Sequence, residues 1–584
     1  MGRASVAGRR RRLKCPPVLE GLPGGLAVCI NSPVPQDALV NPLDNPFYYL
    51  VNFRYVLAWL GERYADVLGT DERAFIECFT TLPEPSQALL VRLVMRKGSL
   101  YRASKLAYPE IGDIAQAAAP LLALGWLCDN GPVSLQELFG VLGKAEVQRC
   151  FCASGVRAGQ RKAEQLAQLL PLYPEAQPFK AWCPGLDVLY RVTLRPLCDR
   201  LRLMFFGNLY QGWSQFVLAD LGLQRFEQVA FEPQSRALAS RGDVDAAIAL
   251  HQAREALEQG AALEDLTARL ATVRTDNPWL DQRREKLIYL VGQHCERQGW
   301  WVQAEQHYRT CRYPGARWRL LRVLERSGRV AEAWALWQHA NAAPESPAEA
   351  QALPRALPRL QRALGLPPQR ARRAPGPQRL DLCLPRGGSV EAAVCQALAE
   401  DGAPVLYLEN ALFNSLFGLL CWPAIFAALP GAFFHPFQHA PADLHQPGFH
   451  SRRQALFEAC LAELDDGQYR TSIRERFASK YGLASPFVFW GALSEPLLDL
   501  ALACIPAQHL KLCFARLLED PKANRAGLPD LVQFWPAEGR YRMIEVKGPG
   551  DRLQDNQLRW MAYFAEHGLP VQVCHVTWQA GALA

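Results

Sequence analysis

Two short apolar runs, joined by a four-residue connection, constrain the fold of this chain most. The runs cover residues 531–535 and 541–546, and Pro536-Ala537-Glu538-Gly539 connects them. This pattern predicts a β-hairpin with a tight turn. A turn centred on Ala537-Glu538 places Asp530 opposite Glu545, and directly opposed residues have Cβ atoms roughly 5 Å apart. The two carboxylates are therefore expected to converge.

Lys547 is expected on the same side of the second strand as Glu545, because side chains alternate along a strand. Ile544 and Val546 would share the opposite, buried side. An isolated Glu-x-Lys on a strand is more often an ion pair on a solvated sheet edge. The facing Asp530 favours a metal site instead, because a divalent cation with hard oxygen ligands, Mg²⁺ or Mn²⁺, relieves the repulsion between adjacent carboxylates. Lys547 would orient or help to deprotonate a water and stabilise charge on an attacked phosphate.

The residues around this hairpin resemble a nuclease signature. Pro529-Asp530, with Glu545-Val546-Lys547 fifteen positions later, resembles the PD-(D/E)xK pattern. The continuation Gly548-Pro549-x-Asp551-Arg552-Leu553, with Gln557 and Trp560, resembles the VRR-NUC branch and specifically the Fanconi-associated nuclease family. A looser similarity extends over most of the chain, through Tyr48-Tyr49-Leu50, Met95-Arg96-Lys97 and Gln438.

The resemblance implies a metal-dependent, structure-selective DNA nuclease. It would act as a 5′ flap endonuclease and a 5′–3′ exonuclease on branched DNA, in the repair of interstrand crosslinks. Because the metal site contacts phosphate rather than base edges, we expect weak sequence preference and selection by DNA shape. Two alternatives stay open. One is a Holliday-junction or restriction-type nuclease; the other is a TPR scaffold that binds branched DNA or a repair protein and keeps a residual nuclease fold.

The resemblance also implies further site residues. Glu409 falls where these nucleases place a third metal carboxylate, and the Val546 carbonyl would complete the metal site with Asp530 and Glu545. From the residues alone, Glu409 is typical of a first-turn glutamate that stabilises its own helix, here over 408–426. Relatives tend to have a His-Gly pair before this glutamate, whereas this chain has Tyr407-Leu408. The predicted DNA contacts are Gln438, Arg452, Arg525, Lys522, Arg552 and Gln557.

Gln557 and Trp560 lie three positions apart on the helix that is expected after the second strand of the hairpin. Residues at this spacing share a helix face, so both can point back towards that strand. Gln557 is expected to hold the water or Lys547. Trp560 is expected to be a core residue.

A chain of 584 residues is too long for a single core and should divide into several domains. The expected fold class is a mostly α multidomain chain with a C-terminal α/β nuclease domain. The predicted parts are a basic tail (1–45), a helical DNA-binding region (46–230) with a SAP-like module near 133–172, TPR-like helical repeats (231–345), a Pro/Arg-rich linker (346–379) and the nuclease domain (380–584).

Local patterns support these divisions. Phe53, Val56, Leu57 and Leu60 recur at helical spacing in the first region. Ser134 and Glu137 have the spacing of a capping box at the start of the SAP-like module. In the repeats, glycines at 242, 299 and 328 each precede an alanine by five residues, which predicts stacked helical hairpins with glycine in the turns. Eight prolines between 344 and 377, interspersed with arginines, predict a partly extended, basic linker.

Composition and motif spacing argue against several other classes. The 17 cysteines include no C-x2-C pair and are odd in number, which indicates reduced thiols rather than a disulfide framework or a zinc finger. His435, His439, His445 and His450 match no zinc-ligand spacing. Eukaryotic members of the family carry a ubiquitin-binding zinc finger upstream. This sequence contains no such motif, so we expect a bacterial-type member. No apolar segment is long enough for a membrane span or a secretory signal, and the expected location is the cytoplasm at the nucleoid, or the nucleus in a eukaryote.

Overall fold

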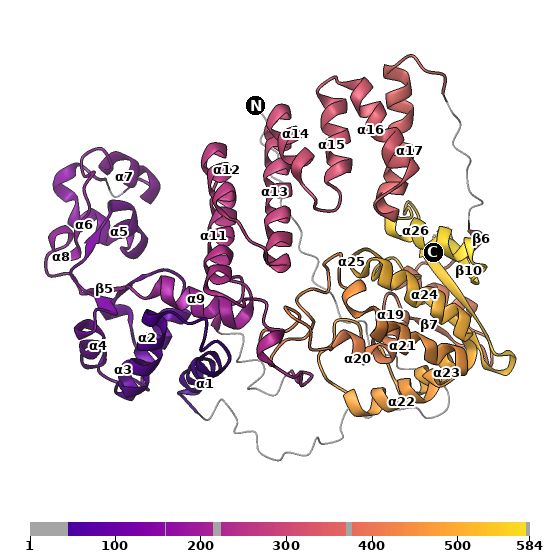
Figure 1. Cartoon of the computed structure of the whole chain (residues 1–584), viewed down its shortest axis with the longest axis horizontal. Coiled ribbons are helices and arrows are strands. Elements are labelled where there is room, and N and C mark those ends of the chain that lie inside the picture. Colours follow the sequence, from indigo (N-terminus) through magenta and orange to yellow (C-terminus); the bar gives the residue numbers. More distant parts are fainter. Residues whose placement is uncertain (1–44, 158, 214–223, 369–376, 580–584) are drawn as a thin grey trace, which may run out of the picture.

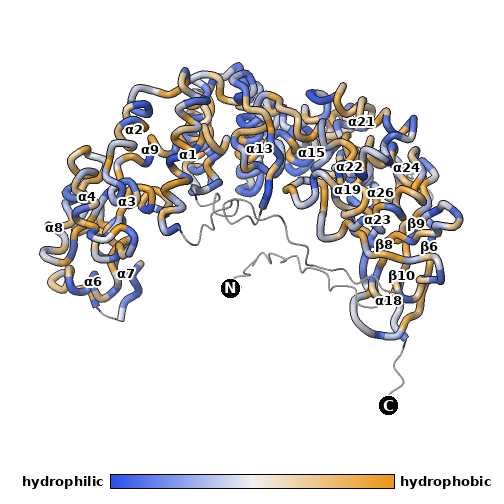
Figure 2. The backbone as a smooth tube through the Cα atoms, turned by 90° about the horizontal axis from the view of Figure 1, so that it is seen from below, coloured by the Kyte–Doolittle hydropathy of each residue, from blue (hydrophilic) through white to orange (hydrophobic). Residues whose placement is uncertain are grey.

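The computed structural model describes residues 45–157, 159–213, 224–368 and 377–579. Figure 1 shows the first helices at one end, an array of helical hairpins in the middle and a sheet-containing C-terminal domain at the other end. Seen from below, these parts form an arch (Figure 2). The predicted basic tail lies outside the described residues except for Asn45. The predicted fold class, mostly helical with a C-terminal mixed sheet, is confirmed.

The first region packs helices against a small antiparallel sheet. Its helices are α1 (Tyr48–Arg63), α2 (Thr70–Thr81), α3 (Glu84–Met95), α4 (Ile114–Ala123) and α9 (Arg195–Phe206). The sheet has the order β1 (Leu100–Arg102), β5 (Leu189–Val192) and β2 (Leu127–Cys128). Phe53, Val56, Leu57 and Leu60 are all buried, which confirms the helical periodicity of this segment.

A separate small module lies between β2 and β5. It contains β3 (Pro132–Val133), α5 (Leu135–Val141), α6 (Lys144–Cys150), α7 (Lys162–Leu169), β4 (Gln177–Pro178) and α8 (Phe179–Trp182). The capping box is confirmed: the Ser134 hydroxyl accepts the Glu137 N–H, and the Glu137 carboxylate accepts the Ser134 N–H. The module has its own hydrophobic core, which includes Leu138, Phe151 and Trp182.

Stacked helices follow from residue 241. They are α11 (Arg241–Glu258), α12 (Leu263–Thr272), α13 (Pro278–Gln298), α14 (Trp301–Thr310), α15 (Ala316–Arg326) and α16 (Val330–Ala342). Gly299 and Gly328 have positive φ in turns between helices, and Ala304 and Ala333 are fully buried, as the repeat spacing predicts. Gly242 departs from this pattern, because it lies in the first turn of α11 rather than between two helices.

The first half of the predicted linker 346–379 is instead a helix, α17 (Pro347–Ala363). Ser346 caps it by accepting the Glu349 N–H, and Pro347 occupies the first turn, where its missing N–H costs no hydrogen bond. Pro354 and Pro358 lie inside the helix, which an isolated helix would tolerate poorly. Burial of Leu353, Leu357 and Leu360 against the preceding repeat compensates, since tertiary packing supplies most helix stability in proteins. The arginines at 370, 372 and 373 lie outside the described residues.

The C-terminal domain is built on a five-stranded mixed sheet of order β6-β10-β9-β8-β7. The strands are β6 (Gln378–Leu384), β7 (Val405–Tyr407), β8 (Leu531–Trp535), β9 (Arg540–Lys547) and β10 (Val571–Trp578). Strands β7, β8 and β9 are antiparallel neighbours, whereas β9, β10 and β6 run parallel. Helix α18 (Val390–Leu398) covers one face through a core that includes Val394, Leu531 and Ile544.

The other face of this sheet packs against a larger helical core. Its helices are α19 (Leu412–Leu420), α20 (Trp422–Ile425), α21 (Gln454–Asp466), α22 (Tyr469–Lys480), α23 (Glu495–Cys504), α24 (Ala507–Glu519), α25 (Pro521–Asn524) and α26 (Asp555–Glu566). Trp560 of α26 is buried in this core, as predicted. Among the described helices none alone has the length and apolarity to cross a membrane; α23 and α24 satisfy those criteria only jointly, and they meet at 107°.

Candidate metal centre and nucleic-acid groove

The hairpin has the predicted register. Leu531 pairs with Ile544 and Val532 with Met543, so Asp530 and Glu545 are the next facing positions beyond the last pair. Gly539 ends the turn with φ of 62°, a conformation that favours glycine. Asp530 Oδ2 accepts a 2.8 Å hydrogen bond from the Val546 N–H, which fixes its carboxylate against the end of β9. The charge of Asp530 raises the pKa of Glu545, as expected for a facing neighbour.

Glu545 is fully buried, and its two oxygens have different environments. Oε1 lies 2.7 Å from Lys547 Nζ and accepts a 2.6 Å hydrogen bond from Gln557 Nε2. Oε2 is buried without a hydrogen-bond partner. Leaving a buried carboxylate oxygen unpaired is costly, so this atom is suited to a cationic ligand.

Both acids have raised pKa values, and burial is the largest cause in each. Burial raises the pKa of Asp530 to about 6, and Glu409 adds to this, while the Val546 N–H and Lys547 oppose it. Burial and the charge of Asp530 raise the pKa of Glu545 to about 8, against the opposing effect of Lys547. Two buried carboxylates that resist ionisation, one with an unpaired oxygen, fit a divalent cation, because a dication would stabilise both charges.

Glu409 occupies the turn after β7 rather than the first turn of a helix. The predicted helix 408–426 begins only at Leu412, with Ala411 as its N-cap, so the helix-stabilising explanation for Glu409 is wrong. The Leu408 N–H donates to the Asp530 carbonyl at 2.9 Å, which ties this turn to the hairpin. Asn410 has φ of 52°, the only positive value for a non-glycine residue in the described chain, and its side chain accepts the Leu528 N–H at 3.1 Å.

The Glu409 carboxylate itself is engaged with its neighbours, accepting from the Tyr407 hydroxyl and, at 3.1 Å, from Asn410 Nδ2. Within the described residues no three Asp, Glu, His or Cys side chains already lie close enough to hold an ion. Asp530 and Glu545 are thus the facing pair, and Glu409 lies close enough to raise the pKa values of both. The role of the Val546 carbonyl stays a prediction.

Glu391 is a residue near this site that no sequence pattern predicts. It lies in the first turn of α18 and, like Glu409, raises the pKa values of Asp530 and Tyr407. Ser389 caps that helix by accepting the Ala392 N–H. A serine at this position predicts where the helix begins, but it does not predict that the helix lies beside the sheet.

Three of the predicted DNA contacts have structural partners instead. Gln557 holds Glu545, and its own Oε1 accepts the Gln554 N–H. Gln438 uses its side chain to close a loop: Oε1 accepts the Phe434 N–H, and Nε2 donates to two carbonyls of the same loop. Arg452 pairs with Asp443 at 2.5 Å, because that buried carboxylate requires cationic neighbours.

The other three predicted cations are arranged differently. Arg525 is half-buried, with its guanidinium 4.9 Å from the Phe487 ring, and it donates to the Pro486 carbonyl. Lys522 is exposed on the short helix α25. Arg552 is exposed in the loop after β9 and has no ion-pair partner among the described residues. Lys522 and Arg552 therefore have cationic groups available to an anionic ligand.

A groove of about 1020 Å³ runs between the helical repeats and the C-terminal domain. One wall comes from α11, α13 and the end of α9, and the other from the loops around 437–447 and 485–489 with Arg525. Its cationic lining residues are Arg254, Arg283, Lys286, Arg312 and Arg525, with His251, His439 and His445 beside them. The repeat pattern predicts stacked helical hairpins but not this charged surface, because the lining residues come from separate parts of the chain.

Cations crowd one another in the groove. Burial, then the charge of Arg254, lowers the pKa of Lys286, and burial lowers the pKa of Arg283 to about 10. Burial followed by Arg525 lowers the pKa values of His439 and His445. Beyond burial, neighbouring cations lower the pKa values of Lys286, His439 and His445, which indicates a positive potential that attracts polyanions.

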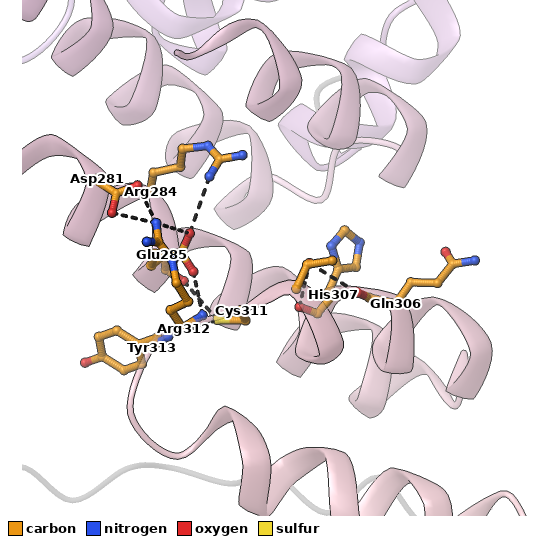
Figure 3. A network of polar contacts seen from close by, with 9 residues as sticks. Asp281, Arg284, Glu285, Gln306, His307, Cys311, Arg312 and Tyr313 are labelled. Atoms are coloured by element: carbon orange, nitrogen blue, oxygen red, sulfur yellow. Dashed lines mark hydrogen bonds and ion pairs between the residues drawn. The ribbon is translucent and has the colours of Figure 1, made fainter. Parts of the chain in front are cut away.

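A polar network fixes the repeat side of this groove (Figure 3). Arg312 Nη2 lies 2.7 Å from Asp281 Oδ2, and the Arg312 N–H donates to Glu285 Oε2 at 2.6 Å. Glu285 is buried, and Arg284 lies 3.4 Å from its other oxygen. These contacts join α13 to the segment after α14, so the wall is preformed.

Three family models match the chain. They are the FAN1, HTH domain over residues 47–128, the Fanconi anemia-associated nuclease SAP domain over 132–182 and the VRR-NUC domain over 464–578. The SAP match includes the predicted module near 133–172 and extends beyond it. The VRR-NUC match begins at residue 464, within the predicted nuclease domain 380–584, and it contains the hairpin but not Glu409.

Similar proteins cover most of the chain. A Fanconi-associated nuclease 1 homolog of Pseudomonas aeruginosa is 56% identical over 92% of this chain and 97% of its own length. A Fanconi-associated nuclease 1 homolog of Arabidopsis thaliana is 24% identical over 90% of this chain and 67% of its own length. A solved structure described as paFAN1 bound to 2nt 5′flap DNA with gap superposes with a TM-score of 0.85, at 56% identity, covering 92% of this chain and 99% of that chain.

Proposed function

The chain belongs to the Fanconi-associated nuclease family, and from this we propose that it incises branched DNA at 5′ flaps. It is a DNA-hydrolysing enzyme with structure-selective nuclease function. The observation that carries the proposal is the unpaired, buried Oε2 of Glu545 beside Asp530 and Lys547. This arrangement has no evident structural purpose, because an uncharged pair would fold at lower cost.

Membership in the VRR-NUC group implies dependence on a divalent metal. We propose Mg²⁺ or Mn²⁺, held by Asp530 and Glu545 and joined by Glu409 and the Val546 carbonyl. When bound, the ion would supply Lewis-acid stabilisation of charge on the scissile phosphate. Gln557 and Lys547 fix the remaining Glu545 oxygen, so the free Oε2 keeps its direction. Lys547 would orient the attacking water and stabilise negative charge on the phosphate.

The basic groove supports selection of DNA by shape. Its lining includes the cationic side chains of Arg254, Lys286 and Arg525, which suit contacts to the phosphate backbone of DNA. Solved relatives are described as bound to 1nt and 2nt 5′flap DNA with gap, and we extend this substrate class to the present chain. We propose Arg525, Lys522 and Arg552 as DNA contacts. The process that we propose is interstrand crosslink repair, in the cytoplasm at the nucleoid.

The test is cleavage of a labelled 5′ flap in Mg²⁺, compared with a Holliday junction and a linear duplex. The flap is expected to be cut fastest. Asp530→Asn and Lys547→Met should each slow cleavage by more than about 100-fold while binding flap DNA normally in Ca²⁺. Glu538→Gln is the matched control, because Glu538 is an exposed carboxylate in the turn of the same hairpin.

Other outcomes would reject this function. Wild-type cleavage by both variants would show that the hairpin site is not the catalytic centre. Faster cutting of the Holliday junction would favour a resolvase-type enzyme. Tight binding of branched DNA without cleavage in Mg²⁺ or Mn²⁺ would favour a scaffold with a residual nuclease fold.

A further inference from the structure

The last helix of the repeats contacts the catalytic domain directly. Figure 1 shows the lower end of α17 beside α26. Arg355 of α17 forms a two-pronged pair with Asp555, at 2.6 and 2.8 Å. Gln351, one turn earlier, donates to the Asp555 carbonyl at 3.1 Å and accepts from Arg559 at 2.7 Å. Two side chains of the repeats thus hold the first turn and a half of α26.

That part of α26 also holds the catalytic carboxylate. Gln557 closes the N-terminal capping box by accepting the Gln554 N–H at 2.8 Å. The same amide donates to Glu545 Oε1 at 2.6 Å. Asp555 lies between these two glutamines in the chain, so a shift of the first turn of α26 would move the amide that orients Glu545.

Helix α17 is itself fixed to the repeats. The Trp337 indole donates to the Leu353 carbonyl at 2.9 Å, and Arg317 pairs with the buried Glu349 at 2.5 Å. Because these two contacts are largely buried, a displacement of the repeats carries α17 with it. Arg359 pairs with Glu325 of α15 at 2.6 Å, but this ion pair is exposed and adds little to the attachment.

We propose that Arg355 and Gln351 are positioning residues, through which the helical repeats set the orientation of Glu545. This inference rests on the proposed function for the identity of the reaction. The path runs from α17 to Asp555 and Arg559, then through the first turn of α26 to Gln557 and Glu545. DNA seated in the groove, whose repeat wall belongs to the same helical stack, would thereby act on the geometry of the metal centre.

The test compares Arg355→Ala and Gln351→Ala with Arg359→Ala. Arg359 is a matched control, because it is on the same helix, is similarly exposed and forms an ion pair that does not touch α26. We expect the first two variants to lower kcat on flap DNA about 3- to 10-fold with unchanged KM and melting temperature, because a small misplacement of a catalytic group is costly. Arg359→Ala should match the wild type, and Arg355→Lys should recover part of the rate.

A second measurement separates positioning from simple stabilisation. Mn²⁺ affinity, measured by electron paramagnetic resonance without DNA, should fall in Arg355→Ala and stay unchanged in Arg359→Ala. In a Gln557→Ala background, Arg355→Ala should have no further effect on either kcat or Mn²⁺ affinity.

The outcomes distinguish this inference from the proposed function. Equal kcat and Mn²⁺ affinity in Arg355→Ala, Gln351→Ala and the wild type would overturn the coupling while leaving the nuclease intact. Additive effects of Arg355→Ala and Gln557→Ala would also overturn it. A wild-type protein that cuts no flap would reject the proposed function alone, and the Mn²⁺ measurements would still decide the coupling.

Discussion

The amide of Gln557 on α26 donates a 2.6 Å hydrogen bond to Glu545 on β9. It shares the accepting oxygen with Lys547, whose ammonium lies 2.7 Å away. The carboxylate is thereby held by one oxygen, while the other is buried and unpaired. A tether of this kind fixes the direction in which the free oxygen can bind a cation, as outer partners of metal ligands commonly do.

Gln557→Ala should therefore weaken metal binding without unfolding the protein. Loss of an outer hydrogen-bond partner typically costs about 10- to 100-fold in metal affinity or activity. We expect losses of that order in Mn²⁺ affinity by calorimetry and in kcat. Gln554→Ala is the control, because Gln554 is exposed and its side chain makes no cap hydrogen bond. Equal affinities in both variants would mean that Lys547 alone orients Glu545.

The buried charge of Glu545 should make the metal-free protein less stable as pH rises. Its folded-state pKa of about 8 lies above the ordinary value of 4.5, so the folded state retains a proton that the unfolded state releases. The resulting loss of stability is absent below about pH 4.5 and complete above about pH 8. In EDTA, Glu545→Gln should thus be more stable than the wild type by about 1 to 3 kcal/mol at pH 8, with no difference near pH 5.

Urea unfolding at both pH values measures this difference, with Glu538→Gln as the exposed control. In Mn²⁺ at pH 8 the wild type should be more stable than Glu545→Gln, because the ion stabilises only the protein that has the Glu545 carboxylate. If Glu545→Gln were less stable than the wild type in EDTA at pH 8, the carboxylate would have an unrecognised structural partner.

The hairpin could be predicted because its determinants are local. A tight turn with Gly539 fixes the register, and the register alone brings Asp530 opposite Glu545. Gln557 was expected to point back to β9, and it does, although it holds Glu545 rather than Lys547. Glu409 could be placed only through the family resemblance, because its turn depends on Asn410 with positive φ and on the pairing of β7 with β8.

Other features depend on contacts that residue type alone does not reveal. Arg452 and Gln438 resemble DNA-contacting residues in the sequence, but in the fold Arg452 pairs with the buried Asp443 and the Gln438 amide closes its own loop. Helix α17 was hidden by its internal prolines, although Ser346-Pro347 was a start signal. The groove combines residues from the repeats and from the C-terminal domain, so no window of sequence contains it.

Tyr407→Phe should strengthen metal binding. The Tyr407 hydroxyl donates to the Glu409 carboxylate, and this contact competes with any ion for the same group. Without that donor, Glu409 can turn towards Asp530 and Glu545, and Mn²⁺ affinity is expected to rise about 3- to 10-fold, the size of one ordinary hydrogen bond. The double variant Tyr407→Phe with Glu409→Gln should lose the gain. Weaker binding in Tyr407→Phe would show that the hydroxyl orients Glu409 for the ion.

Lys286→Ala should reduce the salt dependence of DNA binding. Lys286 lines the groove, and the lowering of its pKa by burial and by Arg254 reflects the crowding of cations there. Each phosphate contact that is lost lowers the slope of log K against log salt by about 1. Flap binding in Ca²⁺ between low and moderate salt measures this slope. Arg322→Ala on the repeats, outside the groove lining, is the control, and an equal slope in both variants would exclude the groove as the DNA path.

Asp443→Asn decides whether Arg452 is a structural or a DNA-binding residue. Asp443 and the Arg453 guanidinium are completely buried, at 2.8 Å, and Arg452 pairs with the same carboxylate at 2.5 Å. Removing one charge of a buried pair leaves the other uncompensated, so Asp443→Asn should cost about 3 to 5 kcal/mol in urea unfolding. Arg452→Ala should lower the free energy of unfolding by less than Asp443→Asn does, because the Arg452 side chain is 34% exposed. The salt dependence of DNA binding in Arg452→Ala should match that of the wild type. A guanidinium that pairs with Asp443 is not available to neutralise a phosphate. If Arg452→Ala lowered the salt dependence of DNA binding without lowering stability, Arg452 would be a DNA contact.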